Sequence, residues 1–266
     1  MTPDPSPYWA RDSRCAMVDE ALTSRSFPVP ALLAGAVVGL QIAYPLVHGE
    51  VRDHLIVAIV LVLAAACVAH AALTRGPMTA AAVLLLTVVP GFAVEVLGVH
   101  TGVPFGHYKY ADSLGPTLFG TPLLIGLAWT MLAWPAAVVA RRLVHGRPAR
   151  VLVGAWALAS TDLFLDPQLV AAGAWTWRSP NPHLPGVADV PLTNFAGWLA
   201  VALVLSIAVQ AVIGDGADAV PIALYLWLYV GWIVALGLFL DRPAAAGWGA
   251  LGMGAVAVPL AIRCRR

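Results

Sequence analysis

Three carboxylic acids, Glu95, Asp162 and Asp166, are the residues best suited to acid–base chemistry, because each lies within a long apolar stretch. An ionised carboxylate at bilayer depth costs at least about 2.5–3.5 kcal/mol on insertion scales, so such acids usually face a polar cavity or a partner. Asp162 and Asp166 are four positions apart and therefore share one face of a helix. Burial and mutual repulsion both favour the protonated carboxyl group. We expect at least one of the three to keep its proton near neutral pH, as a general acid must.

Two of these acids open segments that resemble each other. In each segment an acid precedes a glycine, two aromatic residues separated by one residue, a proline and a tryptophan, with a loop two residues longer in the second copy. The matched pairs are Glu95 and Asp162, Gly106 and Gly173, Tyr108 and Trp175, Tyr110 and Trp177, Pro122 and Pro191, and Trp129 and Trp198. A single buried acid is explained well enough by hydrogen bonds between helices, which average about 0.6 kcal/mol in membranes. Three acids beside two matched aromatic segments indicate a functional site instead.

Aromatic and polar residues of the two segments are the candidates for binding a substrate beside the acids. Belts of Trp and Tyr at the membrane interface are the ordinary explanation of such rings, but matched positions in both copies suggest a lining whose faces converge. Aromatic faces attract cations, including a carbocation formed during a reaction. The candidate binding residues are Tyr108, Tyr110, Trp175, Trp177, Asn194, Trp129, Trp198 and His107. Asn194 is polar enough to hold a water molecule, although capping of the following helix explains it equally well.

The elements that must position these residues are membrane helices. The chain of 266 residues is 60% apolar and 11% charged, against about 25% charged residues in an ordinary soluble domain. Eight stretches suit the roughly 20 apolar residues that cross a bilayer, and a helical reading follows because backbone groups in lipid must be satisfied within the segment. They lie near residues 27–47, 54–74, 79–100, 121–140, 151–171, 192–213, 220–240 and 246–263. The sequence predicts an all-α polytopic transmembrane helical bundle of about eight spans, in which the repeat relates spans three and four to spans five and six.

The charge distribution predicts how this bundle is oriented. Residues 1–26 are polar and lack the apolar core of a signal peptide, so we expect a cytoplasmic N-terminal tail before a single transmembrane domain at 27–266. Most of the 15 Lys and Arg residues fall on the side that holds both termini, which the positive-inside rule places in the cytoplasm. The expected location is the cell membrane. The motif loops at 101–120 and 172–191 then lie on the outer face, and the three acids lie in the outer halves of their helices.

No pattern for a metal, a nucleotide or a nucleic acid is found in the sequence. The seven histidines are scattered, and no carboxylate has the spacing of a metal triad. Phosphate loops, dinucleotide fingerprints and nucleophile elbows are missing. The net charge of +1 comes without a basic patch that would suggest nucleic acid as a partner. We therefore expect neither a metal nor a cofactor.

The residues around the acids resemble the integral-membrane carotenoid hydratases, a family that includes bisanhydrobacterioruberin hydratase and the carotenoid 1,2-hydratases of some bacteria. The likeness covers roughly residues 90–200, while the first two and last two spans match in hydropathy alone. In the first segment it rests on Glu95-Val96-Leu97-Gly98, the run 102–110, Leu114-Gly115-Pro116 and Gly120-Thr121-Pro122 up to Trp129. In the second it rests on Asp162, Asp166-Pro167, Trp175-Thr176-Trp177, Gly186-Val187, Pro191 and the run 194–198.

This resemblance implies an enzyme of carotenoid biosynthesis that adds water to the terminal C1–C2 double bond of an acyclic (ψ) end group, giving a tertiary alcohol. It implies an acyclic carotenoid within the bilayer as substrate, water as second reactant, and other carotenoid-biosynthesis membrane enzymes as conceivable partners. Protonation of the alkene at C-2 gives a tertiary cation at C-1, which water captures. From this chemistry we expect Asp162, the deeper aspartate, to give the proton, Asp166 to position the water and Glu95 to support the proton network.

Other functions remain open from the sequence. A cyclase or isomerase acting on the same ψ-end would also begin by protonating the alkene, and the sequence does not show whether water is admitted. A proton-coupled transporter of a lipophilic substrate would use the acids as proton relays, although the repeat covers two spans per copy and does not divide the chain into equal halves. A non-catalytic scaffold would use the acids to hold helices together.

Overall fold

The computed structural model describes residues 28–265, so the expected tail at 1–26 lies outside the described residues. Seven helices in this part of the chain are long and apolar enough to cross a membrane. They are α2 with its 3-10 extension η2 (Pro28–Ala43 and Tyr44–Leu46), α3 (Glu50–Arg75), α4 (Pro77–Thr101), α5 (Leu124–Leu143), α8 (Leu192–Val212), α9 with the π-helix η4 (Ala219–Val234 and Ala235–Phe239) and α10 (Pro243–Arg265). The predicted all-α polytopic bundle is confirmed.

One predicted span, at 151–171, is two helices instead of one. α6 (Arg147–Ala159) and α7 (Asp162–Ala171) are separated by a turn. In that turn the Thr161 hydroxyl donates to a carbonyl three residues earlier at 2.6 Å, and such local bonds compete with the helical pattern. The expectation of an unbroken helix was wrong, and the interruption places Asp162 in the first turn of α7. The total of eight spans stays a prediction.

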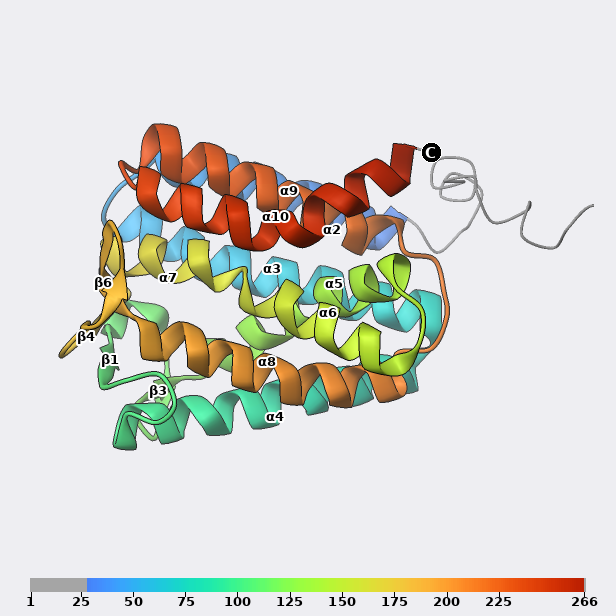
Figure 1. Cartoon of the computed structure of the whole chain (residues 1–266), viewed down its shortest axis with the longest axis horizontal. Helices are drawn as coiled ribbons and strands as arrows, with labels where there is room; N and C mark the ends of the chain where they lie inside the picture. Colours follow the sequence, from blue (N-terminus) through green and yellow to red (C-terminus); the bar gives the residue numbers. More distant parts are fainter. Residues whose placement is uncertain (1–27, 266) are drawn as a thin grey trace, which may run out of the picture.

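Helix α5 lies at the centre of the bundle and packs against α3, α4, α6, α8 and α9. Figure 1 shows the long helices lying side by side along the long axis of the molecule. The α5 residues Trp129 and Trp134 are almost completely buried, whereas peripheral residues such as Leu32 on α2 and Leu85 on α4 are largely exposed. Apolar surface of this kind marks a membrane-facing exterior.

Short strands connect the loops at one end of the bundle (Figure 1). β1 (Tyr108–Tyr110) pairs with β4 (Trp175–Trp177), so the matched aromatic positions of the two motif loops lie together, as the sequence suggested. The other short elements are η3 (Asp112–Leu114), the ladder of β2 (Thr117–Leu118) with β3 (Thr121–Pro122), and the ladder of β5 (His183–Leu184) with β6 (Val187–Pro191). The sequence interpretation had left these segments as loops.

Ion pairs close the opposite end of the bundle. Arg75, at the end of α3, pairs with Asp218 just before α9, and Arg141 of α5 pairs with Asp215. The Arg75 guanidinium also lies over the ring of Trp134, 5.0 Å from its centroid, an attractive cation–π geometry. These contacts fix helices at the end remote from the motif loops.

Candidate active site

Glu95 lies in α4, close to the paired motif loops, and its side chain is buried. Its carboxylate accepts hydrogen bonds from three donors. The Tyr108 and Tyr110 hydroxyls donate to Oε2, the latter at 2.7 Å, and Trp129 Nε1 donates to Oε1 at 3.2 Å. Donors of this number and arrangement hold a carboxylate in one orientation and stabilise negative charge on it.

The two tyrosines are kept as hydrogen-bond donors by their surroundings. Both belong to β1, in the loop beyond the end of α4. Burial raises the pKa of Tyr108 and Tyr110, and the neighbouring Glu95 carboxylate raises the pKa of each further. Their hydroxyls therefore stay protonated across the physiological pH range. Trp129, whose indole N–H can only donate, completes the set.

Asp162 and Asp166 lie one turn apart on α7 and share a donor. Asn194 Nδ2, from the first turn of α8, donates to Asp162 Oδ2 at 2.8 Å and also to Asp166 Oδ2. The side chain of Asn194 is thus directed at the acids and not at the end of its own helix. Among the described residues Asp162 Oδ1 has no partner. Two buried carboxyl groups bridged by one neutral amide resist ionising together, so the pair is suited to holding a proton.

A small cavity of about 40 Å³ brings the two acidic groups together. Glu95 and Asp166 both line it, with Asn194 beside them. The remaining lining residues are Phe105, Tyr108, Tyr110, Ile125, Ala128, Trp129, Leu165, Trp175, Trp177 and Trp198. A water molecule needs roughly 10–15 Å³ of such space, so the cavity has room for one or a few waters between carboxyl groups and aromatic faces.

Two glycines of α4 allow the aromatic donors to approach Glu95. A Cβ atom at Gly91 would lie 2.5 Å from Trp129 Cδ1, and a Cβ atom at Gly98 would lie 2.8 Å from the Tyr108 hydroxyl. Side chains larger than hydrogen at these positions would push the donors away from the carboxylate. The α4 sequence therefore determines the geometry of the site as well as supplying its acid.

The β1–β4 ladder joins the two copies of the sequence repeat about a common centre. Tyr108 lies opposite Trp177, the residue that matches Tyr110, and Tyr110 lies opposite Trp175, the residue that matches Tyr108. A twofold relation between the copies would produce this register. Superposition of the helix pair α4–α5 on the pair formed by α6–α7 and α8 stays a prediction.

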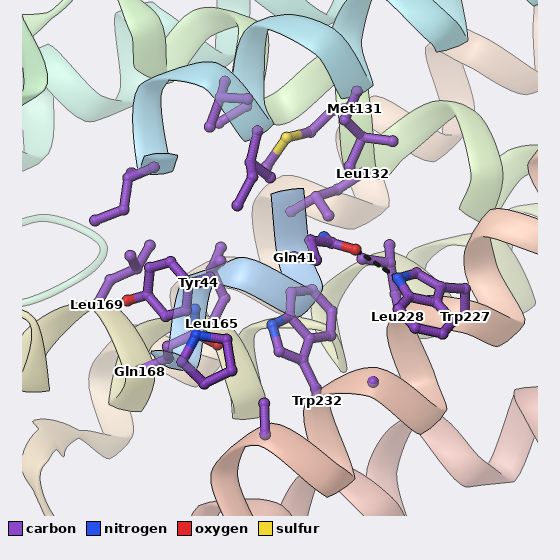
Figure 2. Close-up of a pocket in the computed structure, with 18 of the residues that line it drawn as sticks. Gln41, Tyr44, Met131, Leu132, Leu165, Gln168, Leu169, Trp227, Leu228 and Trp232 are labelled. Atoms are coloured by element: carbon purple, nitrogen blue, oxygen red, sulfur yellow. Dashed lines mark hydrogen bonds between the residues drawn. The ribbon is translucent and has the colours of Figure 1, made fainter. Parts of the chain in front are cut away.

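A larger apolar cavity of about 410 Å³ adjoins the small one, and Ile125, Ala128, Leu165 and Trp175 line both. It lies between α2, α3, α5, α7 and α9. Figure 2 shows Tyr44, Leu165 and Trp232 among the side chains around it, with the Trp227 indole directed at Gln41. Trp227 Nε1 donates to Gln41 Oε1 at 2.7 Å, which satisfies two polar groups within an otherwise apolar wall.

A third cavity, also of about 410 Å³, has polar walls and adjoins the apolar one at the loop end of the bundle. Tyr44 and Gln168 line both of these cavities. The polar walls include Arg52, Asp241 and Arg242. The shared lining residues therefore place the apolar cavity between the small cavity of the acids and the cavity with polar walls.

Most of the residues that the sequence singled out lie together around the small cavity, with two exceptions. Asp162 is fully buried and absent from the lining, and His107 is exposed in its loop with its ring against Gly102. The sequence interpretation also missed residues of the two larger cavities. These are Gln41, Tyr44, Gln168, Trp227 and Trp232. A glutamine within an apolar run, as at position 41, was the signal available for finding them.

Residues 56–259 match the family described as carotenoid biosynthesis protein, which is more than half of the chain. The chain belongs to this family. The match runs from α3 into α10 and includes both acidic groups, whereas α2 precedes it. Membership in the carotenoid biosynthesis protein family thus covers every helix that lines the small cavity.

A curated relative adds detail to the family assignment. The chain is 34% identical over 113 residues to bisanhydrobacterioruberin hydratase of Haloarcula japonica. The aligned part is 41% of this chain and 37% of that protein, so it spans little more than a third of the relative's length. The resemblance that the motifs carry is confirmed by this similarity. No solved structure matches the chain.

Proposed function

We propose that this protein hydrates the ψ-end of an acyclic carotenoid, adding water across the terminal C1–C2 double bond to give a tertiary alcohol. One observation carries the proposal: Asp166, one of a buried aspartate pair, and a triply hydrogen-bonded glutamate line one small cavity with aromatic walls. The hydratase name of the Haloarcula japonica relative supports the same reaction class. The adjoining apolar cavity suits an isoprenoid chain.

Asp166 is the proposed proton donor. It lines the small cavity, whereas Asp162, favoured from the sequence because of its depth, does not. The Asp166 carboxyl proton is transferred to C-2, the π electrons of the alkene form the new C–H bond, and C-1 is left as a tertiary cation. Asp162 and Asn194 hold the resulting carboxylate in place through the shared amide donor.

Glu95 and the aromatic rings are proposed to stabilise the cation at C-1. Glu95 is fixed in orientation by its three donors, so it provides negative charge without reorganising during the reaction. Tyr108, Trp175 and Trp177 line the same space, and aromatic ring faces attract a cation. Both effects are stronger in a site from which bulk water is excluded.

Water completes the proposed reaction. Its oxygen attacks C-1, and the oxonium formed loses a proton to the Asp166 carboxylate, which restores the acid. The net change is the addition of one water molecule, and the atoms and electrons balance without a redox partner or a cofactor. The small cavity has room for this water beside the acids. The cavity with polar walls supports a supply of water from the loop end.

The test is expression of the protein in cells that make an acyclic carotenoid such as lycopene, followed by mass analysis of the pigment. We expect a gain of one or two waters, and no gain with Asp166→Asn at equal expression. An unchanged mass with altered absorption would indicate cyclisation or isomerisation. A pigment unchanged in both mass and absorption would contradict the proposal.

A further inference from the structure

The apolar cavity is open to the exterior of the bundle on one side. Among its described lining residues, the exposed ones are on α2–η2 and α9–η4. They are Ile42, Leu46, Val230, Val234 and Phe239, each at least 40% exposed. The lining residues on α3, α5 and α7 are buried or half-buried. The exposed side of the cavity is therefore formed by α2–η2 and α9–η4, which the Trp227–Gln41 hydrogen bond joins.

The edge of this opening has an unusual backbone. Residues Ala235–Phe239 form the π-helix η4 at the end of α9, and π turns within helices frequently occur at functional sites. Gly231, Ala235 and Phe239 are spaced by four and all line the cavity, so they form one row along its wall. Gly231 has no side chain to obstruct that row.

We propose that an acyclic polyene enters the protein sideways from the bilayer, through a portal between α2 and α9–η4, and occupies the apolar cavity. Its end group then lies beside Ile125, Leu165 and Trp175, which line both the apolar cavity and the small cavity of the acids. The substrate class rests on the proposed function. The other approach, from the loop end, leads through walls that include Arg52 and Arg242, where an apolar chain would desolvate charged groups.

The length of the apolar cavity determines how much of the polyene it can hold. Its α5 wall runs from Leu124 to Leu132, a helical length of roughly 12 Å at about 1.5 Å per residue. This length admits the terminal part of a long polyene, and the remainder stays in the lipid outside the portal. The portal thus remains open around the chain while the end group is held at the acids.

The portal can be blocked reversibly in the folded protein. Val234→Cys, at the opening, is compared with Leu238→Cys, which lies four residues further along in η4, is 77% exposed and is absent from the cavity lining. Each variant in lipid vesicles containing lycopene is treated with a bulky methanethiosulfonate and afterwards with a reductant, and the unsubstituted protein is treated alongside. Pigment retained by the purified protein and pigment hydrated are measured separately.

We expect the adduct at position 234 to lower both the uptake of pigment and its hydration at least tenfold, with recovery after reduction. The adduct at position 238 should change neither more than about twofold. Equal effects at the two positions would overturn the portal. Uptake that depends on position 234 without any mass change would leave the portal standing and contradict the hydratase function. Full hydration by the protein blocked at position 234 would contradict the portal and leave the hydratase function standing.

A second pair of variants tests the other side of the opening. Ile42→Trp places a large ring at the α2 edge of the portal, and Leu32→Trp places the same ring on α2 at an exposed position away from the cavity. We expect Ile42→Trp to lower uptake and hydration together, and Leu32→Trp to leave both near normal. Loss of uptake in both variants, with normal folding, would contradict the portal.

Discussion

The indole rings of Trp129 and Trp198 stack on each other, with centroids 4.2 Å apart and planes inclined by 28°. The two residues hold matched positions in the sequence repeat, and both line the small cavity. They differ in one respect: Trp129 Nε1 donates to Glu95, and no such bond to a carboxylate is found for Trp198 within residues 28–265. The stack therefore provides two similar rings with different electrostatic roles.

Trp129→Phe should lower the hydration rate more than Trp198→Phe. A hydrogen bond to a charged group contributes about 1.5–3 kcal/mol, which corresponds to roughly 10–100-fold in rate. Trp198→Phe retains an aromatic face and removes no donor from Glu95, so its effect should be several-fold at most. Initial rates in membranes, at matched protein levels, measure the difference. Equal losses would mean that the Trp129–Glu95 bond contributes nothing to catalysis.

Asp166→Asn and Asp162→Asn should separate the donor from its supporting residue. General acid catalysis contributes about 10²–10⁴-fold, so Asp166→Asn should lose activity on that scale, and Asp162→Asn should lose less. The double substitution should be little worse than Asp166→Asn alone, because residues that act as a unit are not additive. Initial hydration rates, with carotenoid uptake as the control for folding, distinguish them. The reverse order of losses would assign the proton to Asp162.

Gly249→Ala should destabilise the protein, whereas Gly247→Ala should not. A Cβ atom at Gly249 would lie 2.3 Å from the Phe164 ring, which is fully buried and stacked on Trp232. Overpacking of this kind costs about 1–3 kcal/mol. At Gly247 nothing lies within 4 Å, and alanine in a helix gains roughly 0.5–1 kcal/mol over glycine. Thermal unfolding in detergent should place the two variants on opposite sides of the parent, and a shared direction would contradict the packing argument.

Reporter fusions after Asp112 and after Arg147 should report opposite compartments, with the former outside. The β1–β4 ladder and the α5–α6 connection lie at opposite ends of the bundle, and the charge bias places the ladder on the outer face. Fusions to a periplasmic phosphatase and to a cytoplasmic fluorescent protein at each position measure this. The same compartment at both positions would invalidate the assigned orientation of the acids.

Sequence reasoning predicted the features that a pattern along the chain reveals, such as apolar length or a repeat. Apolar length located most of the helices to within a few residues, and the repeat suggested that the aromatic rings converge beside the acids. It matched Glu95 with Asp162, whereas Asp166 is the aspartate that lines the cavity with Glu95. Sequence reasoning did not predict the break before Asp162, because the Thr161 hydroxyl bond that accompanies the turn has no periodic signature. It also assigned proton donation by depth alone, and the cavity exposes Asp166 in preference to the deeper Asp162.

The apolar cavity was beyond sequence reasoning for a different reason. Its walls come from α2, α3, α5, α7 and α9, and residues such as Gln41 and Trp227 become neighbours only through packing between distant helices. In a membrane helix, residues that face lipid and residues that face an apolar cavity are of the same apolar types, so the sequence does not distinguish them. Only the arrangement of the helices separates Val234, at the cavity, from Leu238, away from it.

The hydrogen-bond donors of each acid belong to the acid's own copy of the repeat. Glu95 is served by Tyr108, Tyr110 and Trp129, and the aspartate pair is served by Asn194. During synthesis, the partners of Glu95 thus emerge directly after it, before the second copy has been translated. Each copy of the repeat therefore satisfies its acidic group with its own side chains, and the small cavity lies where the two copies meet.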